Sequence, residues 1–284
     1  MIELIIYPSS FFAIKKIDED LSEEYNAVKA TGLFDTILFG YDKWFNDGKL
    51  VLSNSVEGKR KAIYRGWMMK PEQYESFYEI LLENNIELIT SPKEYQKMHV
   101  FSNVYQEFGN DTAKLMIFEL HEPIDVNLLK RNFDRFMVKD FVKSVKGTSF
   151  PVFFQGSVSQ KEFDDWMEVF YQYRGELLTG GICIKEYLDL QKYEDRTNEY
   201  RVFYANGQIL TISKNSRQPD YAPSVPLELV EKYQYLASPY YTVDFAELEN
   251  KEWKVLEAGD GGVSGIPENE DIEAYYRALY CCFQ

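Results

Sequence analysis

The first hundred residues alternate between short continuous apolar runs and longer amphipathic segments. The apolar runs predict buried strands, because strands that are covered on both faces lack polar alternation. They lie at residues 2–7, 34–39, 61–64 and 86–89. The amphipathic segments predict helices at residues 20–30, 71–83 and 92–98. Strands alternating with helices at this spacing favour a small parallel α/β sheet.

The pattern changes after residue 98. Further strands are predicted at residues 135–143, 152–155, 182–188, 200–204, 208–213, 240–246 and 253–256. Further helices are predicted at residues 126–131, 159–174, 226–236 and 269–281. Asn206-Gly207 between two apolar runs is a strong hairpin signal. The final third is therefore expected to be a strand-rich, largely antiparallel unit.

Composition is that of an ordinary globular protein, with 45% hydrophobic and 27% charged residues in a 284-residue chain. No apolar run approaches the roughly 18–20 residues that span a bilayer. The start of the chain lacks a basic segment and predicts a first strand instead of a signal peptide. Three cysteines without zinc or disulfide spacing favour a reducing compartment, so we expect a cytoplasmic protein with no membrane association.

Charge and histidine content narrow the function classes. The net charge of −15 argues against a broad nucleic-acid surface, although it leaves room for a local basic groove. Two histidines argue against His-rich metal or triad chemistry, and we expect His99 and His121 to be structural. Cys183 lies in an apolar run and is expected in the core.

The most informative chemistry lies near the C-terminus. One apolar strand carries Asp244, the next leads to Glu257, and a Gly-rich loop carries Asp260. Adjacent antiparallel strands present such side chains to one face, with cross-strand neighbours about 5 Å apart. Two or three carboxylates of this kind suit Mg²⁺ that is held mainly by nucleotide phosphates. The alternative is a solvated hairpin with acids in its turn.

This arrangement resembles the ATP-grasp superfamily, in which a strand Asp and a later Glu-x-Asn hold the magnesium ions on ATP. Here Gly259 stands at the Asn position with Asp260 beside it, so the resemblance implies metal ligation by Asp244, Glu257 and Asp260. It also implies a mixed α/β (α+β) fold in three parts. These are an N-terminal α/β pre-domain at 1–98, a small lid at 99–185 and a C-terminal nucleotide- and metal-binding sheet at 186–284.

Two lysines precede a Gly-Thr-Ser loop at residues 147–149. Lys139 and Lys143 share one face if residues 135–143 form a strand, and their ammonium groups would neutralise phosphates. The resemblance matches Lys139 to the lid lysine that reaches the α- and β-phosphates, and it makes 147–149 a phosphate-covering loop. The alternative is two lysines on an exposed surface.

The segment 181–188 resembles the ATP-grasp hinge, where an apolar strand ends at an acid and the next backbone groups bind adenine. The resemblance assigns nucleotide binding to a run of four residues, Lys185, Glu186, Tyr187 and Leu188. Adenine needs a flat apolar slot with a few fixed hydrogen bonds, which such a strand end supplies. A strand end that faces water is the alternative.

Glu199 and Arg201 alternate with apolar residues and share a strand face. The resemblance places them along the nucleotide cleft, where Arg201 would stabilise charge on a transferring phosphate. The alternative is a surface ion pair worth about 0–1 kcal/mol. Lys214 and Arg217 are weaker phosphate candidates.

Residues at two strand ends of the N-terminal part are candidates for the second substrate. Ligands of open α/β sheets bind beyond the C-terminal ends of strands, where the sequence has 8–10 (Pro-Ser-Ser), Arg65 and Trp67. A purely structural role for Arg65 and Trp67 is the alternative.

Taken together, the resemblance implies an ATP- and Mg²⁺-dependent ligase that activates a carboxylate as an acyl phosphate for attack by an amine or another nucleophile. The implied partner is a small-molecule or peptide acceptor, and a homodimer is a fair default. Three alternatives stay open: a kinase, a nucleotide-binding assembly factor, and ATP-dependent modification of peptide or RNA ends.

Overall fold

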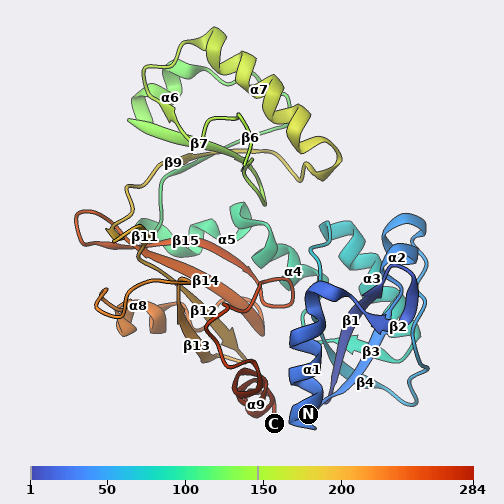
Figure 1. The fold of residues 1–284 in the computed structure, drawn as a ribbon. Coiled ribbons are helices and arrows are strands. Elements are labelled where there is room, and N and C mark those ends of the chain that lie inside the picture. The colour runs from blue at the N-terminus through green and yellow to red at the C-terminus, as the bar shows by residue number, and fades with distance from the viewer. Residues whose placement is uncertain (1, 146) are drawn as a thin grey trace.

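The computed structural model describes residues 2–145 and 147–284, so Met1 and Lys146 lie outside it. Three parts are visible in Figure 1: an N-terminal α/β part in blue and cyan, a lid in green and yellow, and a C-terminal sheet in orange and red. The mixed α/β class with several sheets confirms the predicted fold class.

The N-terminal part is built on a mainly parallel sheet around β1(Leu4–Ser10). β1 pairs in parallel with β3(Asp35–Phe39) and β4(Arg60–Tyr64), and β4 pairs with β5(Ile86–Leu88). A short strand, β2(Ala13–Ile17), folds back antiparallel on β1. The helices of this part are α1(Ser22–Thr31), α2(Tyr41–Asp47), α3(Pro71–Glu83) and α4(Pro92–His99), with a 3-10 turn at Glu19–Leu21. The expected parallel sheet is confirmed, and β2 and α2 are additions.

The lid is an antiparallel sheet covered by helices. Its strands, in spatial order, are β6(Leu115–Phe118), β9(Ile182–Glu186), β7(Arg135–Asp140) and β8(Phe154–Gln155). Its helices are α6(Val126–Asn132) and α7(Gln160–Arg174), with a 3-10 turn at Gly175–Leu177. Buried Phe136, Phe154, Phe163 and Phe170 fill the space between sheet and α7, so the lid has a core of its own.

The C-terminal part is an antiparallel sheet in the order β13(Gln208–Lys214), β12(Glu199–Ala205), β14(Tyr240–Glu247) and β15(Trp253–Asp260). One face packs against α4, α5(Phe101–Phe108) and α8(Leu227–Lys232). The opposite face packs partly against α9(Ile272–Cys282), which also lies beside α1. A 3-10 turn at Gly109–Asp111 follows α5, and a small hairpin, β10(Lys192–Tyr193) and β11(Arg196–Thr197), precedes β12. The predicted Asn206-Gly207 hairpin joins β12 to β13, with φ of 48° and 70°.

Strand ends differ from the sequence prediction at two places that matter for the site. The strand predicted at 135–143 ends at Asp140, because the Asp140 carboxylate accepts hydrogen bonds from the amides of Val142 and Lys143 and closes a turn. The strand predicted at 253–256 continues to Asp260, so Glu257 and Asp260 both lie within β15. None of the helices in the described parts combines the length and hydrophobicity needed to cross a bilayer.

Candidate nucleotide and metal site

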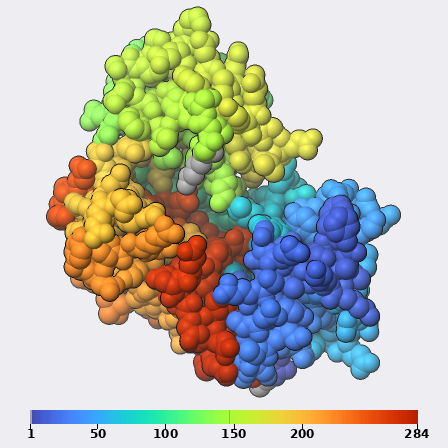
Figure 2. Space-filling view, in the orientation of Figure 1, coloured from blue at the N-terminus to red at the C-terminus, as the bar shows by residue number. Residues whose placement is uncertain are grey.

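A cleft of about 130 Å³ lies between the lid and the C-terminal sheet. Figure 2 shows the recess beneath the lid, with the C-terminal part below it. Its polar walls come from Lys139 and Lys143 of the lid side, Arg201, Thr242, Asp244 and Glu257 of the sheet, and His99 at the end of α4. Segments far apart in the chain therefore converge on one small polar space.

Register within the sheet aligns three of the predicted residues. Arg201 on β12 is the cross-strand partner of Asp244 on β14, and Asp244 is the partner of Glu257 on β15. Both guanidinium nitrogens Nε and Nη2 of Arg201 lie 2.8 Å from the Asp244 carboxylate oxygens. This bidentate pair fixes the orientation of Asp244 toward the cleft.

The lid reaches the sheet through Lys139. Its Nζ lies 3.0 Å from Oε1 of Glu257; the Lys139 side chain is 2% exposed and that of Glu257 is 51% exposed. Desolvation by the cleft walls would raise the pKa of Glu257, but the Lys139 and Lys185 ammonium groups lower it to about 2. Glu257 is therefore an ionised carboxylate at every physiological pH.

Lys185 lies on the same face of the lid sheet as Lys139, since their strands pair antiparallel in register. Its ammonium donates to the Leu256 carbonyl and lies 4.7 Å from the Phe101 ring centre, which Lys139 also approaches at 5.3 Å. Burial, with Lys139 nearby, lowers the pKa of Lys185 to about 8. Two crowded cations above one aromatic ring form a positive site for an anionic ligand.

The structure does not bring Asp260 to the other two acids. Asp260 is three positions beyond Glu257, and consecutive strand residues point to opposite faces. Asp260 is 1% exposed, its Oδ1 accepts from the Gly262 amide at 2.8 Å, and burial raises its pKa to about 7. No group of three acidic, His or Cys side chains with metal-ligand spacing occurs among the described residues. The expected three-carboxylate cluster is thus corrected to a pair.

The pair still fits Mg²⁺. Magnesium on a nucleotide keeps waters and takes only one or two carboxylates, the remaining ligands being phosphate oxygens. Asp244 and Glu257 are direct cross-strand partners on the cleft face, each ionised group being paired to a cation that a phosphate would also attract. These two residues are the ones that would hold the metal.

Lys143 lines the same cleft by a different route from the predicted one. It lies beyond the end of β7, in the turn that Asp140 closes, and not on the strand face beside Lys139. Arg174 of α7 in turn holds Asp140, with Nε 2.8 Å from Oδ2. The turn therefore carries Lys143 to the cleft edge.

The hinge residues lie beside a separate cavity of about 610 Å³ whose lining includes Glu186, Tyr187 and Leu188. The Glu186 carboxylate accepts from the Lys114 amide at 3.0 Å, and the Tyr187 amide donates to the Arg135 carbonyl at 3.0 Å. Adenine binding by these three residues stays a prediction.

Glu199 lies next to Arg201 along β12 and accepts a hydrogen bond from the Thr197 hydroxyl. Both line a third cavity of about 310 Å³, to which Asp244 and Lys214 also contribute. Because Arg201 and Asp244 line both spaces, this cavity adjoins the cleft.

The N-terminal candidates are placed differently from each other. Arg65 is 2% exposed and forms an ion pair with Glu24 at 2.6 Å, so the expected contact with a second substrate is wrong for this residue. Trp67 stays partly exposed and donates to Asp18 at 3.2 Å. Ser9 is buried at 2% exposure. Cys183 is buried as expected, and burial raises its pKa to about 12.

Sequence reasoning missed two cleft residues. His99, expected to be structural, is 8% exposed, stacks on Tyr95 at 4.8 Å and lines the cleft. Thr242 lines it because it precedes Asp244 by two positions on one strand, which is a signal that the alternation of β14 already contains. His99 left no such signal, because its position depends on how α4 packs against β15.

Comparison with known proteins identifies the fold. A family model described as an ATP-grasp domain, family 3 of its clade, matches residues 130–279, which is more than half of the chain. No curated protein matches the chain.

Solved structures of ATP-grasp enzymes superpose over nearly the whole molecule. The ATP-grasp ligase PsnB, solved with a minimal precursor, has a TM-score of 0.62 at 9% identity, covering 99% of each chain. D-alanyl-alanine synthetase A from Vibrio cholerae has a TM-score of 0.60 at 9% identity, covering 99% of this chain and 98% of its own. The macrocyclase MdnC from Microcystis aeruginosa, bound to the precursor peptide MdnA, has a TM-score of 0.56 at 14% identity, covering 99% of both. The chain belongs to the ATP-grasp superfamily, within the clade family whose model covers its lid and C-terminal sheet.

Proposed function

We propose that this protein is an ATP- and Mg²⁺-dependent ligase that activates a carboxylate as an acyl phosphate for attack by an amine or another nucleophile. The observation that carries the proposal is the cross-strand pair Asp244 and Glu257, which faces Lys139 of the lid within one cleft. Acids from the sheet and cations from the lid are what a metal–triphosphate needs on its two sides.

Each residue has a task in this scheme. Asp244 and Glu257 hold Mg²⁺, which bridges phosphate oxygens and neutralises their charge when bound. Lys139 leaves Glu257 for the phosphates, and Lys185 and Lys143 add positive charge beside it. Arg201 keeps Asp244 oriented and stabilises charge on the γ-phosphoryl group as it moves to the acceptor carboxylate. Glu186, Tyr187, Leu188 and Glu199 bind the base and ribose side of the nucleotide.

The acceptor is a peptide or a small molecule. This class is supported by the relatives of the same fold, among which PsnB and MdnC are solved with precursor peptides and another is a D-alanyl-alanine synthetase. The proposal also includes the division into a pre-domain at 1–98, a lid at 99–185 and a C-terminal part at 186–284, together with a cytoplasmic location and a homodimer.

The test measures binding and turnover separately. Calorimetry with Mg²⁺ and a non-hydrolysable ATP analogue should show binding by the wild type and at least tenfold weaker binding by Glu257→Ala. Glu252→Ala, which removes an exposed acid from the same hairpin, is the matched control and should bind as the wild type does. ADP release is then screened over carboxylate and amine substrates.

The outcomes separate the competing functions. Mg²⁺-dependent ADP release with formation of an amide product supports ligation, whereas a stable phosphorylated product indicates a kinase. Nucleotide binding without ADP release over a broad panel indicates a binding factor. Full turnover by Glu257→Ala would contradict the metal assignment.

A further inference from the structure

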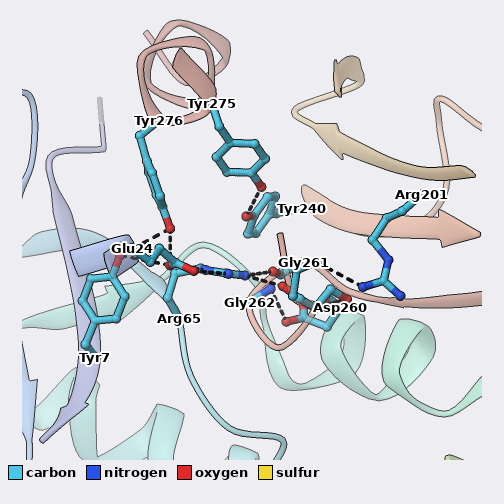
Figure 3. Close-up of polar contacts among 12 residues, drawn as sticks. Tyr7, Glu24, Arg65, Arg201, Tyr240, Asp260, Gly261, Gly262, Tyr275 and Tyr276 are labelled. Atoms are coloured by element: carbon cyan, nitrogen blue, oxygen red, sulfur yellow. Dashed lines mark hydrogen bonds and ion pairs between the residues drawn. The ribbon is translucent and has the colours of Figure 1, made fainter. Parts of the chain in front are cut away.

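A buried ion pair lies where the N-terminal part meets the C-terminal sheet. Arg65, directly after β4, places Nε 2.8 Å and Nη2 2.6 Å from the two carboxylate oxygens of Glu24 on α1. The hydroxyls of Tyr7 and Tyr276 also donate to Glu24, as Figure 3 shows. Burial would raise the pKa of Glu24, but the Arg65 guanidinium lowers it, so the pair is ionised.

The same guanidinium also holds the loop that follows β15. Nη1 of Arg65 donates to the carbonyls of Gly261 and of Ser264, the latter at 2.9 Å. The neighbouring Gly66 amide donates to the Gly262 carbonyl at 3.0 Å. Three carbonyls of one short loop are thus held by two consecutive residues of the N-terminal part (Figure 3).

The other end of this loop is part of the nucleotide cleft. Ser264 and Gly265 line the cleft, and the Gly265 carbonyl accepts from Nη1 of Arg201 at 3.1 Å. Arg201 holds Asp244 with its remaining nitrogens. A continuous chain of hydrogen bonds therefore runs from Glu24 through Arg65 and the loop to the pair Arg201–Asp244.

The loop has no slack in which to move independently. A Cβ on Gly262 would lie 2.6 Å from the Tyr64 carbonyl oxygen, and one on Gly261 would lie 2.7 Å from the Tyr240 ring. Ser264 Oγ lies 2.8 Å from the Asp260 carbonyl and 2.9 Å from the Thr242 hydroxyl. The path of the loop is consequently set by what Arg65 and Gly66 hold.

An ion pair of this kind is a costly way to obtain stability alone. Removing water from two charges offsets much of their attraction, and well-packed apolar residues often stabilise as much. What the planar guanidinium adds is orientation, because its donors satisfy a carboxylate and two carbonyls in fixed directions. Lysine has no such fork.

We propose that Arg65 is a positioning residue for the nucleotide cleft: it fixes loop 261–265 and, through Gly265, the pair Arg201–Asp244. It touches no substrate, since only 2% of it is exposed. The N-terminal part thereby contributes to nucleotide binding from outside the cleft. This inference rests on the proposed function for its effect on nucleotide binding.

The test uses a variant that keeps the interface packed. The double substitution Arg65→Met with Glu24→Leu removes both charges together, so neither is left buried alone. Circular dichroism checks the fold. Native-state hydrogen exchange should show the amides of Gly262, Val263 and Gly265 exchanging at least tenfold faster, with the lid amides unchanged. Binding of the Mg²⁺–ATP analogue should weaken about tenfold.

A matched control comes from the same strand. Arg60→Met with Asp35→Leu removes the ion pair at the start of β4, where the Arg60 and Asp35 side chains are 28% and 70% exposed. We expect loop exchange and nucleotide affinity to stay at wild-type values. Arg65→Lys, which keeps the charge without the fork, should fall between the wild type and the double variant.

The hydrogen-exchange readout needs no nucleotide and therefore distinguishes two kinds of failure. Wild-type loop exchange in a folded Arg65→Met, Glu24→Leu variant would overturn the proposal. So would unfolding of both this variant and Arg65→Lys, because the pair would then serve overall stability. Faster loop exchange in a protein whose wild type binds no nucleotide would instead overturn the proposed function.

Discussion

Lys139 of the lid and Glu257 of the C-terminal sheet form an ion pair of 3.0 Å across the cleft. The pair is asymmetric, because the lysine is almost fully buried while half of the glutamate side chain is exposed. It joins the two groups that the proposed function assigns to phosphate and to metal. Each group therefore occupies the position that the other's ligand would take, and nucleotide binding must separate them.

Replacing the lid lysine should weaken nucleotide binding. Lys139→Met removes the positive charge that we assign to the phosphates, and we expect affinity for the Mg²⁺–ATP analogue to fall at least tenfold in calorimetry. Lys161→Met, which removes an exposed lysine of α7 that pairs with Asp165, is the control. Equal affinity of wild type and Lys139→Met would refute this role.

Nucleotide affinity should decline in alkaline solution. Burial lowers the pKa of Lys185 to about 8, so its charge in the free protein is present below that pH and is lost as pH rises through it. Loss of this charge predicts binding up to about tenfold weaker at pH 9 than at pH 7. Lys185→Arg, which stays charged over this range, should flatten the profile. A wild-type affinity that is constant from pH 7 to pH 9 would contradict the prediction.

The buried Asp260 should make stability depend on pH. Its pKa is about 7 in the folded protein, whereas an ordinary aspartate has a value of about 3.9. Its contribution to stability is full below about pH 4 and is lost as pH rises toward 7, because the unfolded chain releases the proton first.

Asp260→Asn removes this titration. Relative to the wild type, we expect its free energy of unfolding to gain up to about 4 kcal/mol between pH 4 and pH 8. Urea denaturation at several pH values measures the difference. Asp195→Asn, at a largely exposed position, is the control. Parallel stability curves for Asp260→Asn and wild type would show that Asp260 is not protonated in the fold.

His99 should stay neutral in the cleft. Burial, with the Lys143 ammonium nearby, lowers its pKa to about 4. We expect its ring proton resonances to be constant from pH 5.5 to pH 8 in NMR spectra. The chain has two histidines, so His121→Gln leaves one signal to follow. A titration midpoint between pH 6 and pH 7 would disagree with the buried environment.

Local patterns in the chain were enough to predict most elements and the pair of acids. Alternation along 240–246 and the hairpin at Asn206-Gly207 set the strands, and the class of fold followed from the order of strands and helices. The carboxylates Asp244 and Glu257 were found because cross-strand partners share a face. These features depend on neighbours that are close in sequence.

Tertiary structure decided the remainder. Asp260 faces away from the acids because β15 continues through it, and the length of a strand depends on which partner it pairs with. Lys143 reaches the cleft because Asp140 ends β7 and Arg174, from a distant helix, holds that turn. Arg65 is buried because Glu24 and loop 261–264 enclose it from opposite ends of the chain. A one-dimensional pattern shows which residues can be buried or charged, but burial and pairing of a charge are properties of groups that only folding brings together.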